Sequence, residues 1–128
     1  MLNYSIGEMG VKEDNAIVEK SKQFAVRMVR LNQYLVKEKK EYVLSKQAVR
    51  SGTSIGANVH EAQRAQSRKD FLAKMSIASK EASETEYWLE LLHETGYIDQ
   101  TAFQSISADC TEIIKMLVSI VKATGKDN

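Results

Sequence analysis

Apolar side chains recur at alternating spacings of three and four residues through four segments of this chain. Such spacing places them on one face of an α-helix, so each segment predicts one helix. The expected helices span about residues 14–38, 45–64, 68–95 and 99–123. The third has the most regular period, through Phe71, Met75, Ala78, Ala82, Thr85, Leu89 and Leu92. Residues 1–13 show no sustained period, and we expect a loose N-terminal arm there.

Residues suited to helix capping stand near the expected helix ends. They are Asp14 or Asn15, then Ser45, then Ser67 with Asp70 in a capping box, and Gly96 as a left-handed C-cap followed by Tyr97 and Ile98. The connections between the four segments are short, which favours antiparallel neighbours. The pattern therefore predicts an all-α protein, an antiparallel up-down-up-down four-helix bundle with left-handed packing, formed by residues 14–124 as one domain.

The second helix carries small residues on its apolar face. Gly52 and Gly56 each cost about 1 kcal/mol relative to Ala inside a helix, so close approach of a neighbouring helix must offset the cost. Charged and polar neighbours such as Arg50 exclude a membrane-embedded helix pair. Asn58 and Glu61 lie on one side of this helix, near its apolar face. If buried, they must be hydrogen-bonded, so we expect a polar contact to a neighbouring helix or an open helix end.

Composition agrees with one globular domain. The chain has 128 residues, 43% hydrophobic and 27% charged, with no proline and six glycines. No apolar run approaches the roughly 18 residues of a membrane span and no signal peptide is recognisable, so we expect no membrane association and a cytoplasmic location. The single cysteine, Cys110, falls in an apolar helical series and is expected to be a small buried side chain rather than a nucleophile.

Charge is distributed unevenly along the chain. Residues 19–80 carry a net charge of +9 and residues 81–128 a net charge of −6, although the whole chain is close to neutral at +1. One explanation is a basic face for nucleic acid with an acidic face elsewhere. The other is a pair of complementary faces that meet within the fold or between subunits, and the sequence alone leaves both open.

The segment from residue 47 to residue 98 resembles the signature of the four-helix bundle family of 23S rRNA-intervening-sequence proteins. In that family a pattern S-I-x-x-N-x-x-E-A precedes a loop with S-x-x-D/E-F, a helix rich in small residues and glutamates, and a closing G-Y-I or G-Y-L. The matching residues are Ser54, Ile55, Asn58, Glu61 and Ala62, then Ser67, Asp70 and Phe71, then Glu81, Glu84 and Glu86, then Gly96, Tyr97 and Ile98. Gln63 departs from members that have glycine at this place.

The resemblance implies a bacterial protein without an established enzymatic activity. Genes of such proteins occur inside insertions of large-subunit rRNA genes and also as free-standing genes. The family is similar to accessory proteins of diversity-generating retroelements, which form five-membered rings and engage a reverse transcriptase and nucleic acid. The resemblance therefore implies a homo-oligomer, and a pentamer is the expected assembly.

Catalytic and metal chemistry find little support in the sequence. Glu90 and His93 have the Glu-x-x-His spacing of di-iron bundles, but a second copy is missing because His60 is followed, not preceded, by a glutamate. Glu81, Glu84 and Glu86 spread over different helix faces, so pairing with Lys or Arg is the expected role. We expect no catalytic residues, no cofactor and no enzyme activity, with a metal-binding bundle as the lesser alternative.

Two kinds of partner remain open. The main hypothesis is a protein-interaction scaffold that binds itself and another protein. The alternative is an RNA- or DNA-binding accessory protein with a basic patch near the junction of the second and third helices. Its members are Arg50, Arg64, Arg68, Lys69 and Lys74. The sequence pI of about 7.8 is low for a dedicated nucleic-acid-binding domain.

Overall fold

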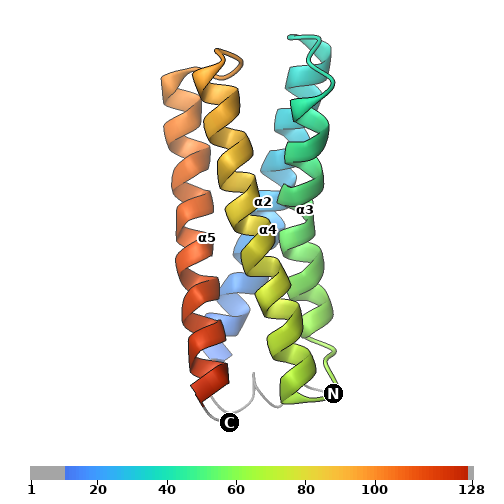
Figure 1. The fold of residues 1–128 in the computed structure, drawn as a ribbon, viewed down its shortest axis with the longest axis vertical. Coiled ribbons are helices and arrows are strands. Elements are labelled where there is room, and N and C mark those ends of the chain that lie inside the picture. The colour runs from blue at the N-terminus through green and yellow to red at the C-terminus, as the bar shows by residue number, and fades with distance from the viewer. Residues whose placement is uncertain (1–10, 127–128) are drawn as a thin grey trace.

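Four helices make up the described part of the protein in a computed structural model (Figure 1). The structure describes the backbone of residues 11–126 and the side chains of residues 16–125. The helices are α2 (Val11–Lys37), α3 (Leu44–Ala62), α4 (Arg68–Glu94) and α5 (Gln100–Lys126). No strand occurs within residues 11–126, so the predicted all-α bundle of four helices is confirmed.

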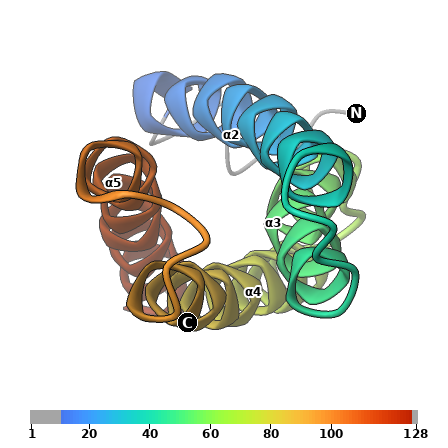
Figure 2. The same ribbon diagram turned by 90° about the horizontal axis from the view of Figure 1, so that it is seen from above.

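The helices surround a common axis in chain order. Figure 1 shows the α2–α3 and α4–α5 connections at one end of the bundle and the α3–α4 connection at the other, so successive helices run in opposite directions. Seen along the axis in Figure 2, each helix lies beside the next one, and α5 returns to the side of α2. The contact between α2 and α5 is the smallest of these four pairs. Left-handed packing stays a prediction.

Side chains at the spaced apolar positions form the core. Phe24, Met28, Ile55 and Phe71 are at most 1% exposed, and the core also contains residues from the middle of α5. Cys110 is fully buried among them, as its position in the apolar series predicted. Burial of these large side chains removes apolar surface from water and is the main force that holds the helices together.

Two helix boundaries differ from their predictions. Helix α2 begins at Val11, so Asp14 and Asn15 lie inside it and do not precede its first turn. The remainder of the expected arm, residues 1–10, lies outside the described residues. Helix α5 continues through Gly125 to Lys126 although its end was expected before that glycine. A single glycine costs about 1 kcal/mol in a helix interior and less in a last turn, which is too little to stop a helix.

The predicted N-cap of α3 was wrong. Ser45 lies inside the helix, and its hydroxyl donates to the backbone oxygen of Glu41 at 2.7 Å. The Glu41 carboxylate accepts instead from the backbone N–H groups of Val43 at 3.1 Å, Leu44 at 2.8 Å and Ser45 at 2.7 Å. A glutamate before the helix reaches these free N–H groups because the connection bends its side chain inward, where it is 8% exposed.

The ends of α4 agree with the sequence. The hydroxyl oxygen of Ser67 accepts from the N–H of Asp70 at 2.9 Å, as expected of an N-cap. Gly96 has a φ of 85°, the left-handed conformation predicted for the C-cap, and the N–H of Tyr97 donates to the oxygen of Leu92 at 2.9 Å. Ile98 then turns back into the core and is 5% exposed.

The two glycines of α3 lie against α2. A Cβ atom on Gly52 would stand 2.5 Å from Cγ of Met28, and one on Gly56 would stand 3.1 Å from the backbone oxygen of Ser21. Both distances are shorter than ordinary van der Waals contact. The close helix approach that the sequence predicted is therefore present, and its partner is α2.

Candidate functional site

Arg50, the first residue of the predicted basic patch, is held by ion pairs between α3 and α4. Its guanidinium lies 3.3 Å from the Glu81 carboxylate and also contacts the Glu84 carboxylate. The hydrogen bond from Arg50 to Glu84 raises the pKa of the guanidinium. Glu81 and Glu84 thus pair with a basic side chain of another helix, which was their expected role.

Glu84 also anchors the single tryptophan. The indole N–H of Trp88 donates to its carboxylate at 2.9 Å. The hydrogen bonds from Trp88 and from Arg50 hold the pKa of Glu84 below its ordinary value. Tyr87 meets the Trp88 ring edge-on with ring centroids 5.1 Å apart. Charged and aromatic side chains thus form one connected network on the face where α3 and α4 meet.

Lys74 forms a second link between α4 and α3. Its ammonium group lies 3.0 Å from the Glu61 carboxylate, and this hydrogen bond raises the pKa of Lys74. The interhelical contact expected for Glu61 is therefore present. For Asn58 the expectation was wrong, because its side-chain amide donates to the oxygen of Ser54 in its own helix at 2.9 Å. The amide reaches that carbonyl one turn earlier without leaving the helix surface.

The remaining three basic residues lie at the α3–α4 connection. Arg64 and Lys69 are exposed and Arg68 is half-buried. Among residues 16–125, no carboxylate pairs with Arg64 or Lys69. About 18 Å of helix separates Arg50 from the end of α3 at 1.5 Å per residue. The structure therefore places three patch residues together, leaves Lys74 nearby in an ion pair, and separates Arg50 from them.

His93, considered as a metal ligand with Glu90, takes part in helix packing. Its ring stacks on Phe103 of α5 with centroids 4.3 Å apart and an angle of 5° between the planes. Glu90 is exposed. Within the described residues, no three His, Cys, Asp or Glu side chains gather at a position that could hold a metal ion.

The buried cysteine of the core is not a nucleophile near neutral pH. Burial raises the pKa of the Cys110 thiol to about 12, and the charges of Glu86 and Asp109 add to the effect. A thiol with this pKa stays protonated at neutral pH, and only the thiolate attacks electrophiles.

Thr85, treated as an apolar position by the sequence pattern, donates to the Ser51 hydroxyl at 2.8 Å. This buried hydroxyl pair joins α3 to α4, and nothing in the periodicity distinguishes it from an apolar contact.

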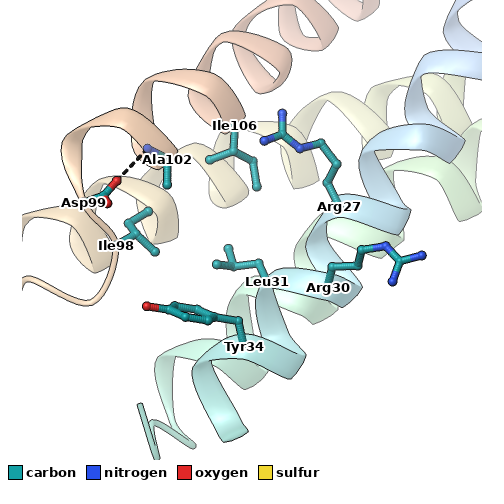
Figure 3. Close-up of a pocket in the computed structure, with 8 residues that line it drawn as sticks. All are labelled: Arg27, Arg30, Leu31, Tyr34, Ile98, Asp99, Ala102 and Ile106. Carbon is teal, nitrogen blue, oxygen red and sulfur yellow. Dashed lines mark hydrogen bonds between the residues drawn. The ribbon is translucent and has the colours of Figure 1, made fainter. Parts of the chain in front are cut away.

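A pocket of about 440 Å³ opens between α2, the α4–α5 connection and the start of α5 (Figure 3). Its apolar walls come from Leu31, Ile98 and Ile106, whereas Arg30 points away from the other lining side chains. The guanidinium of Arg27 forms an ion pair with the Asp109 carboxylate at an N–O distance of 2.7 Å.

The remaining polar groups of this pocket offer little catalytic chemistry. The Asp99 carboxylate already accepts from the N–H of Ala102 at 2.8 Å and caps α5. A guanidinium is permanently protonated and cannot exchange protons near neutral pH. The Tyr34 hydroxyl is the remaining polar group of the lining, and no described histidine or cysteine lines the pocket.

Two further hollows lie along α2. One, of about 480 Å³, follows the α2–α3 groove beside Gly56 and includes Lys22, His60 and Glu61. The other, of about 340 Å³, lies on the outer face of α2 and includes Val26, Val29 and Arg30. None of the described helices is long and apolar enough to cross a membrane.

Comparison with known proteins identifies a family and a similar crystal structure. The family model described as "23S rRNA-intervening sequence protein" matches residues 13–119. A crystal structure of a protein with unknown function from the S23 ribosomal protein family of Bacteroides thetaiotaomicron is 59% identical in sequence. Its TM-score is 0.85, and the match covers 86% of this chain and 98% of that one. Among curated proteins, none matches this chain.

Proposed function

This chain belongs to the 23S rRNA-intervening sequence protein family, and from that premise we propose that it is a non-enzymatic, homo-oligomeric scaffold. The observation that carries the proposal is the outer face of α2. There Val26 is 43% exposed and Val29 is 41% exposed, and both line the outer hollow together with Lys22 and Arg30. Adjacent exposed apolar side chains with a polar rim are typical of protein interfaces.

The outer face of α4 has complementary properties. Tyr87 is 56% exposed, and the exposed carboxylates Glu90 and Glu94 lie on the same side of the helix. The α2 face is basic and the C-terminal part of the α4 face, beyond the exposed Lys80, is acidic. Contact between α2 of one copy and this part of α4 of the next is therefore electrostatically favourable. A contact between two different faces produces a ring when the rotation closes. We propose a ring of five, the size that the family resemblance implies.

Light scattering on the purified protein tests the assembly. The expected result is a solution mass about five times that of the 14.4 kDa chain. Val29→Lys should reduce the mass to that of one chain because it places a charge in the apolar part of the α2 face. Val118→Lys on α5 is the matched control, because Val118 has the same 41% exposure on a helix without the proposed contact.

Charge reversal tests which faces meet. Lys22→Glu with Arg30→Glu should dissociate the ring, and adding Glu90→Lys with Glu94→Lys should restore it. A wild-type mass of one chain contradicts the oligomer. Dissociation by Val118→Lys but not by Val29→Lys contradicts the α2 face.

A second candidate function is nucleic-acid binding at the α3–α4 connection. The observation that favours it is that Arg64 and Lys69 are exposed without carboxylate partners in the described residues, whereas Arg50 and Lys74 are paired. Free cations can neutralise phosphates and release counterions. Arg64→Ala with Lys69→Ala should weaken binding to structured rRNA fragments and flatten its salt dependence. Unchanged binding by this double variant removes the candidate.

A further inference from the structure

The α2–α3 connection carries the two most exposed large apolar side chains in the described chain. Val43 is 71% exposed and Tyr42 is 58% exposed. Four exposed lysines surround them in sequence, and we call the whole group the basic loop surface. It consists of Lys37, Lys39, Lys40, Tyr42, Val43 and Lys46.

The positive charge of this surface is not neutralised within the fold. None of its four ammonium groups has a carboxylate partner among residues 16–125. Of the two glutamates in residues 37–46, Glu41 is turned into the protein and its charge is taken up by three backbone N–H groups. Only Glu38 is exposed beside the lysines. The surface therefore presents a net positive charge to solvent.

Hydrogen bonds join the loop that displays Tyr42 to the helices on either side of it. Lys40 occupies the left-handed region with φ 55°, and the N–H of Glu41 donates to the oxygen of Leu35 at 3.0 Å. The buried Glu41 carboxylate then fixes the next residues through their N–H groups. Because Glu41 points inward, its neighbour Tyr42 projects outward from an ordered backbone. A loop whose backbone is already ordered in the free protein loses less conformational entropy on binding.

We propose that the basic loop surface binds unpaired segments of nucleic acid. Lysines along a strand neutralise its phosphates, and an exposed aromatic ring stacks on a base whose face is free. Duplex nucleic acid and anionic phospholipid also present phosphates, but neither offers a free base face to the Tyr42 ring. The combination of four cations with one projecting aromatic ring thus favours a single strand.

This surface is independent of the proposed oligomer and of the candidate at the α3–α4 connection. The two connections lie at opposite ends of the bundle (Figure 1). Failure of the scaffold proposal would leave the basic loop surface unaffected. Variants at the two ends also separate the two nucleic-acid hypotheses.

The test is a fluorescence anisotropy titration with a labelled oligouridylate or oligothymidylate of about 20 nucleotides, long enough for a single site. At low salt the wild type should bind. The logarithm of its binding constant should fall linearly with the logarithm of the salt concentration, with a slope of about −3, as expected for four phosphate contacts on a single strand. Lys39→Gln with Lys40→Gln should reduce that slope to about half. Lys115→Gln with Lys122→Gln, on exposed α5 positions, is the matched control and should change neither affinity nor slope.

The ring of Tyr42 is tested separately from the charges. Tyr42→Ala should weaken single-strand binding about tenfold without changing the salt slope, because stacking is not electrostatic. Tyr42→Phe should retain the affinity, and Tyr87→Ala, which removes a similarly exposed tyrosine on α4, should have no effect on it.

Three outcomes overturn the proposal. The first is absence of oligonucleotide binding by the wild type at low salt. The second is equal affinity for a duplex of the same length with no effect of Tyr42→Ala. The third is binding to vesicles of anionic phospholipid in place of the oligonucleotides. Unchanged melting temperatures of the variants establish that losses of binding do not come from unfolding.

Discussion

At the scale of single residues, Glu41 begins α3 through its carboxylate. Burial of the carboxyl group opposes its ionisation, but the N–H groups of Leu44, Ser45 and Val43 outweigh burial and lower the pKa below the ordinary 4.5. Charge-assisted hydrogen bonds to free helix N–H groups are among the stronger polar contacts in proteins. The side chain therefore combines the roles of helix cap and loop anchor.

Glu41→Gln should destabilise the protein by about 1 kcal/mol near neutral pH, the usual value for loss of a helix cap. The lowered pKa means that the folded state favours the carboxylate, so this stability is present above the ordinary pKa and is lost as pH falls through the folded value. Urea unfolding at several pH values measures it. The difference between wild type and variant should shrink as the pH falls below the ordinary value of 4.5.

Glu38→Gln provides the control for this prediction, because Glu38 is an exposed neighbour on the same connection. Its unfolding free energy should match that of the wild type at every pH. An equal loss in both variants would show that the effect comes from net charge and not from the cap.

Cys110 makes the second prediction at the residue scale. Its Sγ is fully buried and lies 3.5 Å from the backbone oxygen of Ala82, and burial raises its pKa to about 12. A disulfide reagent added near neutral pH should therefore react with the denatured chain at once and with the native chain only as it opens. The absorbance of the released thiolate measures both rates. Equal rates with and without denaturant would contradict the buried, protonated thiol.

At the scale of secondary structure elements, the α2–α3 contact depends on two glycines. Gly52→Ala should gain about 1 kcal/mol in helix propensity but lose more through overlap with the fully buried Met28. The expected net effect is a destabilisation of about 1 kcal/mol, measured by urea unfolding. Met28→Ala removes the overlap with Cγ and leaves only the Cβ atom of residue 28, 3.0 Å from the added Cβ, so in that background the same substitution should destabilise the protein much less.

The same substitution at Gly125 isolates the propensity effect. Gly125 lies in the last turn of α5, and a Cβ atom there would meet nothing within 4 Å. Gly125→Ala should therefore stabilise the protein by about 0.5 kcal/mol or less. Stabilisation of similar size by Gly52→Ala would disprove the close contact between α2 and α3.

At the scale of the whole molecule, the uneven charge of the chain is partly neutralised by ion pairs between helices at the bundle surface. Lys20 pairs with Glu112 at 3.0 Å, Arg27 pairs with Asp109 at 2.7 Å, and Arg50 pairs with two glutamates of α4. Each pair joins the basic part of the sequence to the acidic part. The fold thus brings complementary faces together, while the lysines of the α2–α3 connection keep their charge exposed.

The bundle is closed most weakly between α2 and α5. Their contact is the smallest of the four, and both of their ion pairs involve side chains that are about 40–50% exposed. Exposed ion pairs contribute little and weaken in salt. Hydrogen exchange measured by mass spectrometry should show less protection in α5 than in α3 and α4, with a further decrease at high salt. Equal protection in all four helices would contradict this view of the bundle.

The sequence by itself determined the number of helices, the residues of their core faces and the caps at Ser67 and Gly96. These features are local, because a period of 3.6 residues and a free helix end depend on neighbours within one or two turns. The family motif was equally visible, since its residues keep fixed spacings within one segment of the sequence. The small residues of α3 predicted a close contact but not the helix that makes it.

Only the tertiary structure decided what lies opposite each side chain. It paired Gly52 with Met28, joined Ser51 to Thr85, and turned Glu41 inward in place of Ser45 as the cap of α3. It also divided the predicted basic patch and left the lysines around Tyr42 exposed. Such contacts depend on the relative rotation and spacing of helices. The periodicity of one helix does not contain that information, because it defines an inward face without naming the residues that meet it.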